Sequence, residues 1–194
     1  QKNIPHGSGL GGGSSNTASL LNFLNTKMHL KLNKNTINQI ASKIGFDVPI
    51  NLEKKNSLLT GKKGKILRLN QRFKLNVLFV YPNIICSTKK IYEKNKKFTL
   101  SKPPSYFHIK NNKKLIDHLK NDNNDLEKTV IKFYPKVGKI IDLIKGQNGC
   151  YLSRITGTGS ACFGIFSNMK TAILTKKLIK LKFPKYWCVV SKTI

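Results

Sequence analysis

Residues 4–15 read Ile-Pro-His-Gly-Ser-Gly-Leu-Gly-Gly-Gly-Ser-Ser and lead directly into an apolar segment with helical spacing. Glycine permits positive φ angles and lets backbone N–H groups approach an anion without a Cβ in the way. The start of the following helix adds N–H groups that have no partner within the helix, at the positive end of its dipole. This stretch therefore predicts a cradle for the phosphates of a nucleotide. A flexible linker is the alternative, and the immediate entry into an apolar helix argues against it.

Three familiar phosphate-binding loops fit this stretch poorly. A P-loop needs a lysine after its last glycine, whereas Gly13 is followed by two serines. A dinucleotide-binding loop needs a preceding strand and an acidic residue about 20 positions later. Here the segment before Gly7 is short and polar, and the next acidic residue is Asp47. The His-Arg-Asp and Asp-Phe-Gly triplets of protein kinases do not follow either. A fourth pattern fits better.

The order Pro-x-x-x-Gly-Leu-Gly-Gly-Gly-Ser-Ser, from Pro5 to Ser15, resembles the ATP-binding motif of the GHMP kinases, a superfamily of small-molecule kinases. Within it, Lys2–Pro5 and Ile44–Pro49 look like the family that acts on 4-diphosphocytidyl-2-C-methyl-D-erythritol in the non-mevalonate isoprenoid pathway. Further matches follow in that family's order, and they are Val80–Pro82, Ser87-Thr88, Ile91-Tyr92, Asn124–Glu127 and Ser153–Gly164. The resemblance covers nearly the whole chain.

The resemblance implies an α+β fold with the two-domain GHMP kinase architecture. We expect residues 1–69 to be the remainder of an N-terminal, ribosomal-S5-like ATP-binding domain, and residues 70–194 to be a ferredoxin-like C-terminal domain. Family members carry a strand-and-loop segment with a Lys and an Asn well upstream of the glycines. Because this chain opens on Gln1, only six residues before Gly7, we interpret it as an N-terminally truncated piece whose first domain is incomplete.

The resemblance also implies a reaction, the ATP- and Mg²⁺-dependent phosphorylation of the 2-hydroxyl of the diphosphocytidyl alcohol. Asp47 matches the family's aspartate beside the acceptor hydroxyl, where a carboxylate can take the proton as oxygen attacks phosphorus. A solvated loop aspartate is the alternative, and the pattern Gly-x-Asp-Val-Pro argues against it. The residues expected to bind ATP are Lys2, Pro5, Gly7, Gly9, Leu10, Gly11, Gly12, Gly13, Ser14 and Ser15.

Thr88 and Tyr92 match the family's threonine near the substrate and the aromatic residue that stacks on cytosine. On residue chemistry alone, a helix N-cap for Thr88 and a core or surface aromatic for Tyr92 fit equally well. Gly157, Thr158 and Gly159 match a further glycine motif that packs near the phosphate loop and the substrate. A plain hairpin turn is the alternative there. No metal-ligating cluster is predicted, because the cysteines and histidines are dispersed along the chain.

The charge balance is unusual, since Lys+Arg 36 against Asp+Glu 8 gives a formal net charge of +28. Such a charge suggests nucleic acid or an anionic membrane surface. The lysines are scattered, however, without a basic patch interleaved with aromatic residues. We therefore expect a solvated basic surface, a small-molecule substrate, and no nucleic-acid or membrane partner. The alternatives are a homoserine or mevalonate type of kinase and, outside the enzymes, a basic RNA-binding module.

The apolar runs are too short to cross a bilayer. Four separate cysteines without a Cys-x-x-Cys pair indicate free thiols, as in a cytoplasmic protein. Hydrophobic spacing and capping residues predict helices at 14–26, 36–44, 113–119, 125–133, 136–144 and 170–181. They predict strands at 75–81, 150–155, 162–166 and 186–190. For the second helix we expect Asn35 as N-cap and Gly45 as the stop, and we read Lys54–Gly64 as a turn region.

Overall fold

The computed structural model describes residues 3–60, 64–99 and 109–193. The chain divides into two compact units. The helical unit comprises Gly11–Arg72, and the sheet unit comprises Phe73–Thr193 together with the chain up to Leu10. The division falls inside the glycine loop, so the first glycines belong to the sheet unit and the later ones to the helical unit. The boundary expected at residue 69 stays a prediction.

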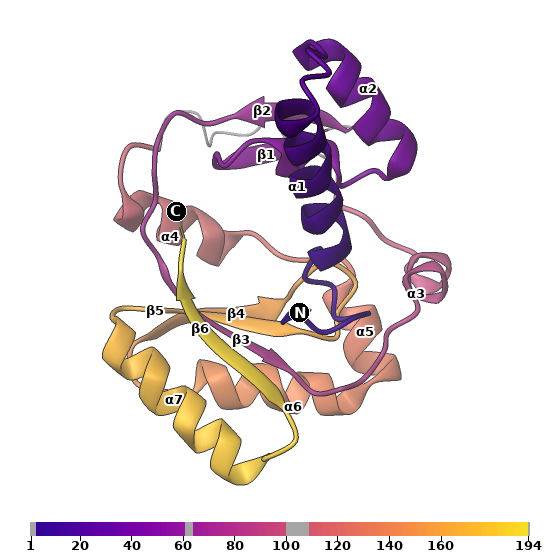
Figure 1. Ribbon diagram of the computed structural model, residues 1–194. Helices are drawn as coiled ribbons and strands as arrows, with labels where there is room; N and C mark the ends of the chain where they lie inside the picture. The colour runs from indigo at the N-terminus through magenta and orange to yellow at the C-terminus, as the bar shows by residue number, and fades with distance from the viewer. Residues whose placement is uncertain (1–2, 61–63, 100–108, 194) are drawn as a thin grey trace. The chain divides into compact units, whose positions relative to one another are not determined.

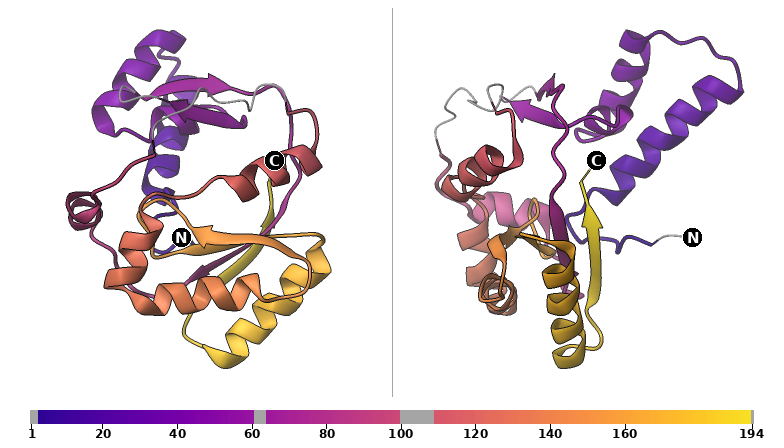
Figure 2. Two further views of the ribbon diagram at one scale, coloured as in Figure 1. Left: turned by 180° about the vertical axis from the view of Figure 1, so that it is seen from behind. Right: turned by 90° about the vertical axis from the view of Figure 1, so that its left-hand side faces the viewer.

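The sheet unit is built on four antiparallel strands in the order β4-β5-β3-β6. The strands are β3 (Asn76–Tyr81), β4 (Cys150–Ile155), β5 (Cys162–Phe166) and β6 (Trp187–Lys192). The helices are α3 (Thr88–Lys94), α4 (Asn112–Asn121), α5 (Glu127–Phe133), α6 (Pro135–Lys145) and α7 (Met169–Lys182). Helices α6 and α7 cover one face of the sheet and α4 lies on the other (Figures 1 and 2). This strand order is that of a ferredoxin-like domain, so the α+β expectation is confirmed.

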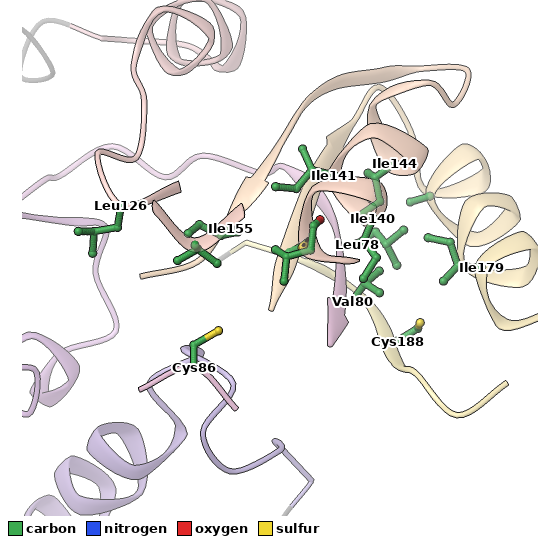
Figure 3. Packing of buried hydrophobic residues seen from close by; sticks show 14 of the residues in the cluster. Leu78, Val80, Cys86, Leu126, Ile140, Ile141, Ile144, Ile155, Ile179 and Cys188 are labelled. Atoms are coloured by element: carbon green, nitrogen blue, oxygen red, sulfur yellow. Dashed lines mark hydrogen bonds between the residues drawn. The ribbon is translucent and has the colours of Figure 1, made fainter. Parts of the chain in front are cut away.

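Alternation along β3 builds two cores, because successive side chains of a strand point to opposite faces. Leu78 and Val80 join the cluster under α6 and α7, whereas Val77 joins a smaller cluster with Ile116 of α4. Figure 3 shows the larger cluster, with Leu78 and Val80 facing side chains of α6 such as Ile140. The four-residue spacing of Ile140 and Ile144 places both on the buried face of α6.

Within its described residues, the helical unit contains two helices, one short 3₁₀ helix and one hairpin. They are α1 (Gly12–Lys27), α2 (Lys34–Ile44), η1 (Pro49–Leu52), β1 (Ser57–Thr60) and β2 (Lys65–Arg68). Its buried apolar centre consists of Ala18, Ala41 and Val48. In the part of the chain that the structure describes, no helix combines the length and hydropathy needed to cross a bilayer.

The structure corrects the predicted start of the second helix. Asn33, not Asn35, is the N-cap, and its side-chain oxygen accepts a hydrogen bond from the Thr36 N–H at 3.0 Å. Both asparagines have the right chemistry, but only Asn33 has the extended backbone that a cap requires. The expected stop at Gly45 is confirmed, since its N–H bonds the Ala41 carbonyl at 3.1 Å.

The turn predicted over Lys54–Gly64 is wrong, because β1 lies inside it and pairs antiparallel with β2. Lysine and glycine around residues 61–63 favoured a turn in the prediction, and the two strands beside them are too short for alternation to reveal. Residues 61–63 lie outside the described part of the chain. Helix α3 also escaped prediction because it is only two turns long. In α1, which was predicted at 14–26, Leu20 is exposed and Ala18 is buried.

Candidate active site

The first half of the glycine loop adopts a backbone that only glycine takes easily. Gly7 and Gly9 have φ angles of 68° and 79°, in the left-handed region. A Cβ added at Gly9 would lie 2.7 Å from the carbonyl oxygen of Gly159 and 2.8 Å from that of Thr156. Gly9 is therefore required by both its φ angle and the close approach of a second loop.

That second loop connects β4 to β5 and includes Thr156–Ala161. The Thr156 hydroxyl donates to the Gly9 carbonyl at 2.5 Å, and the Ala161 N–H donates to the Ser8 carbonyl at 3.0 Å. The connection is thus a hairpin turn that also contacts the glycine loop. The role of Gly157–Gly159 near a substrate stays a prediction.

Residues at the start of α5 and just before it hold the second loop in place. The Asn124 side-chain amide donates to the Gly157 carbonyl at 2.8 Å. The Glu127 carboxylate accepts from the Ile155 N–H at 2.9 Å. Beneath the loop, burial raises the pKa of the Cys86 thiol to about 11, which keeps this side chain neutral. The loop is therefore held by polar side chains on one side and packs near the neutral Cys86 thiol on another.

The second half of the glycine loop begins helix α1. Gly11 is the N-cap, with a φ angle of 66° and no side-chain cap, and the first intrahelical bond is donated by the Ser15 N–H to the Gly11 carbonyl. The N–H groups of Gly12, Gly13 and Ser14 precede that bond, so they have no partner within the helix. A row of such donors at the positive end of a helix dipole is suited to phosphate oxygens.

Asp47 lies in the helical unit, in the loop between α2 and η1, and its side chain is exposed. Its carbonyl accepts a hydrogen bond from the Asn51 side-chain amide at 2.7 Å. The next residue, Val48, is buried against Ala18 of α1 and Ala41 of α2. The backbone at Asp47 is therefore anchored through Val48 to helix α1, and its side chain is exposed on a loop.

Arg68 fixes the segment that follows Asp47. Its guanidinium donates to the Pro49 carbonyl at 2.8 Å, to the Ile50 carbonyl at 2.6 Å and to the Ser57 hydroxyl at 2.7 Å. Its Nε lies 3.7 Å from a Glu53 carboxylate oxygen, and its side chain is only 17% exposed. We call this set of bonds the Arg68 clamp. It ties η1 to the β1-β2 hairpin.

Two of the predicted substrate residues meet in the sheet unit. The hydroxyls of Thr88 and Thr158 lie 3.1 Å apart, although seventy positions separate them in the sequence. Ser87, not Thr88, caps α3, so the capping alternative for Thr88 is wrong. Tyr92 is 52% exposed and its ring stacks on that of Phe98, with centroids 6.4 Å apart. It is a surface aromatic, and its role in stacking on cytosine stays a prediction.

The remaining predicted residues lie as follows. The Pro5 carbonyl accepts a hydrogen bond from the buried Ser8 hydroxyl at 2.8 Å, and Leu10 is half-buried. Lys2 lies outside the described residues. Among the residues that the structure describes, no three His, Cys, Asp or Glu side chains gather in a way that could hold a metal ion.

Sequence reasoning did not single out several residues that support the loops. They are Ser8, Thr156, Asn124, Glu127 and Arg68. The first four lie inside or beside stretches that match the family, which was the available signal. No such signal was available for Arg68, because the strand that carries it was not predicted.

Comparison with known proteins supports the kinase interpretation. The model of the GHMP kinases N terminal domain matches residues 1–53, and that of the GHMP kinases C terminal matches residues 107–180. The chain is 36% identical to the 4-diphosphocytidyl-2-C-methyl-D-erythritol kinase of Pelagibacter ubique, over 100% of this chain and 67% of the relative. It is 35% identical to the enzyme of that name from Thermodesulfovibrio yellowstonii, over 100% and 69%.

Solved structures show the same fold. A crystal structure of 4-(cytidine 5'-diphospho)-2C-methyl-D-erythritol kinase matches with a TM-score of 0.73 at 22% identity, covering 98% of this chain and 68% of that one. The homoserine kinase of Cytophaga hutchinsonii matches with a TM-score of 0.72 at 16% identity, covering 100% and 68%. The chain thus spans about two thirds of the length of its relatives. It belongs to the GHMP kinases, in the family of the 4-diphosphocytidyl-2-C-methyl-D-erythritol kinases.

Proposed function

We propose that this protein transfers the γ-phosphoryl group of ATP to the 2-hydroxyl of 4-diphosphocytidyl-2-C-methyl-D-erythritol and releases ADP. One observation carries the proposal. Left-handed glycines lead into a helix start without a side-chain cap, in a chain that is 36% identical over its whole length to a kinase of that name. The phosphate cradle supports the nucleotide, and the sequence similarity supports the alcohol.

In this proposal the glycine loop binds the phosphates of ATP, and Asp47 takes a proton from the acceptor hydroxyl. The N–H groups of Gly12, Gly13 and Ser14 would hold the phosphate oxygens. Asp47 would accept the proton of the 2-hydroxyl as its oxygen forms a bond to the γ-phosphorus. The bond from that phosphorus to the bridging oxygen of ADP then breaks, and ADP leaves with the negative charge.

We propose that Mg²⁺ enters the site bound to the phosphates of ATP, where it would offset their negative charge. The hydroxyls of Ser14 and Ser15, at the start of α1, are oxygen donors of the kind that Mg²⁺ accepts. The paired hydroxyls of Thr88 and Thr158 are proposed to bind the substrate, and the exposed ring of Tyr92 to stack on its cytosine. We place the reaction in the cytoplasm, in keeping with free cysteines.

The test is ADP release by the complete natural chain with ATP and Mg²⁺, with and without the diphosphocytidyl alcohol. We expect release that depends on this alcohol. Homoserine and mevalonate serve as controls, because the fold match to a homoserine kinase is as good as the match to the proposed family. Turnover with one of these, and none with the diphosphocytidyl alcohol, would contradict the proposed acceptor and keep the kinase.

The RNA-binding alternative makes a separate forecast. Binding to any RNA would fall steeply as salt rises, because counterion release drives it, and it would not need Asp47. Filter binding at low and high salt distinguishes this from a kinase. Tight RNA binding without ADP release would overturn the proposed function.

A further inference from the structure

Helix α7 is apolar on two sides. Ala172, Thr175 and Ile179 are buried on the side that packs against β3, β5 and β6. On another side Leu174, Leu178 and Leu181 are 54%, 40% and 83% exposed, and we call them the leucine stripe. Their spacing of four and then three residues places them in one row along the helix. A contiguous row of exposed apolar side chains is a candidate interaction site.

The leucine stripe borders a shallow depression that it shares with Leu143 of α6. Lys177 and Lys182 lie in the same lining, and the Lys182 Nζ lies 5.8 Å from the centroid of the Phe183 ring. Both helices lie on the same side of the sheet and on the opposite side from α4 (Figures 1 and 2). Long lysine side chains can lay their methylene groups along apolar surface and keep the charge outward.

The sequence that carries the stripe is basic. From Leu143 to the C-terminus the sequence contains no Asp or Glu, and the nearest acidic residue in sequence is Asp142. The basic residues of the same stretch are Lys145, Arg154, Lys170, Lys176, Lys177, Lys180, Lys182, Lys185 and Lys192. Among the described residues, the ion pairs within 4.0 Å all involve Glu53 of the helical unit. Neither Lys177 nor Lys182 therefore forms an ion pair with a described carboxylate.

We propose that the leucine stripe docks on an anionic phospholipid surface. The leucines would enter the boundary of the acyl chains while the flanking lysines meet the phosphate headgroups, as in helices that lie in a membrane interface. A second copy of this chain is a poor occupant, because it brings the same net charge of +28 and no acids of its own in this stretch. Leu181 is the most exposed of the three and suits insertion better than a fit into a protein groove. The scattered lysines in the sequence led us to expect no membrane partner. The proposal adds one, a membrane surface to which the protein binds.

The experiment is co-sedimentation of the complete natural chain with vesicles. We use phosphatidylcholine alone and an equimolar mixture with phosphatidylglycerol. Binding is expected only with the mixture. The triple variant Leu174→Gln, Leu178→Gln, Leu181→Gln should lower the partition coefficient by ~10-fold or more, because three apolar side chains no longer leave water. Glutamine keeps a high helix propensity, so α7 should remain folded.

A charge-matched pair of variants separates the stripe from the overall charge. Lys177→Gln with Lys182→Gln should weaken binding to the anionic vesicles clearly more than Lys113→Gln with Lys114→Gln on α4, although both remove two charges. Equal weakening by the two pairs, with no effect of the leucine changes, would overturn the proposal in favour of diffuse attraction. Absence of binding to the anionic vesicles would also overturn it. So would a dimer in sedimentation equilibrium that the leucine changes dissociate, since a second copy would then be the occupant.

Discussion

The sheet unit and the helical unit are each stabilised internally in a different way. The sheet unit buries a continuous cluster that includes Leu78, Ile140 and Ile144. The helical unit buries little more than Ala18, Ala41 and Val48, and it leaves large apolar residues such as Leu20, Phe23 and Phe46 exposed. There the Arg68 clamp joins η1 to the hairpin with hydrogen bonds. The candidate base, Asp47, thus lies in the unit with the smaller core.

The largest expected effect tests this difference in cores. Leu78→Ala should lower the free energy of unfolding by about 3–5 kcal/mol, because it removes a fully buried side chain and leaves a cavity. Val48→Ala in the helical unit should cost less, about 1–2 kcal/mol, because fewer atoms leave a smaller core. Urea denaturation of both variants measures the two values. Equal losses would contradict the contrast between the units.

A second prediction concerns chemistry in the less packed unit. Asp47→Asn should lower kcat by ~10²-fold or more while the affinity for ATP stays nearly unchanged, as expected on loss of a general base. Steady-state kinetics and nucleotide titration give the two quantities. Asp117→Asn on α4 is the matched control and should be neutral. Unchanged turnover in the Asp47 variant would remove this residue from the mechanism.

The two halves of the glycine loop offer a third comparison. Gly9→Ala should destabilise the protein by about 2 kcal/mol or more, because it combines a left-handed φ with a clash against two carbonyl oxygens. Gly13→Ala meets nothing within 4 Å and should leave the melting temperature unchanged or slightly higher. Thermal unfolding of the variants without nucleotide checks both. Similar melting temperatures would show that the second loop does not press on Gly9.

A fourth prediction probes the Arg68 clamp. Arg68→Gln should cost about 1–3 kcal/mol, because the Pro49 and Ile50 carbonyls lose a charged donor. Arg72→Gln, at an exposed position of the same unit, is the control and should change little. Hydrogen exchange of the η1 segment reports the loss locally. Identical exchange in both variants would mean that the clamp does not hold this segment.

The smallest effect is a dependence on pH. A hydrogen bond from Lys34, together with the charges of Lys34, Arg68 and Lys55, lowers the pKa of Glu53 below its ordinary value of 4.5, although burial opposes the shift. A lowered folded-state pKa gives stability that is present above pH 4.5 and disappears as the pH falls through the folded value. The difference in unfolding free energy between wild type and Glu53→Gln should therefore shrink in acid. A difference that is constant from pH 7 to pH 3 would contradict this.

Local patterns in the sequence predicted most helices and strands of the sheet unit and identified the glycine loop. Val77, Leu78 and Val80 alternate between two faces, and Ile140 and Ile144 repeat at helical spacing, so each element carries its own signal. The hairpin of the helical unit was not predicted, because its strands are four residues long and flanked by lysines. The roles of the site residues remain predictions that the kinetic experiments test.

The sequence by itself indicated the family and most helices and strands, and it predicted the glycine loop as a phosphate site, because these depend on neighbouring residues and on φ angles that glycine alone takes easily. Only the tertiary structure decided what supports the loop. The bond from Thr156 to Gly9 joins residues 147 positions apart, and Arg68 reaches back 19 positions to Pro49. It also decided that the leucine stripe of α7 is exposed while Ile179 is buried. Such contacts depend on how distant segments pack, and no local periodicity encodes them.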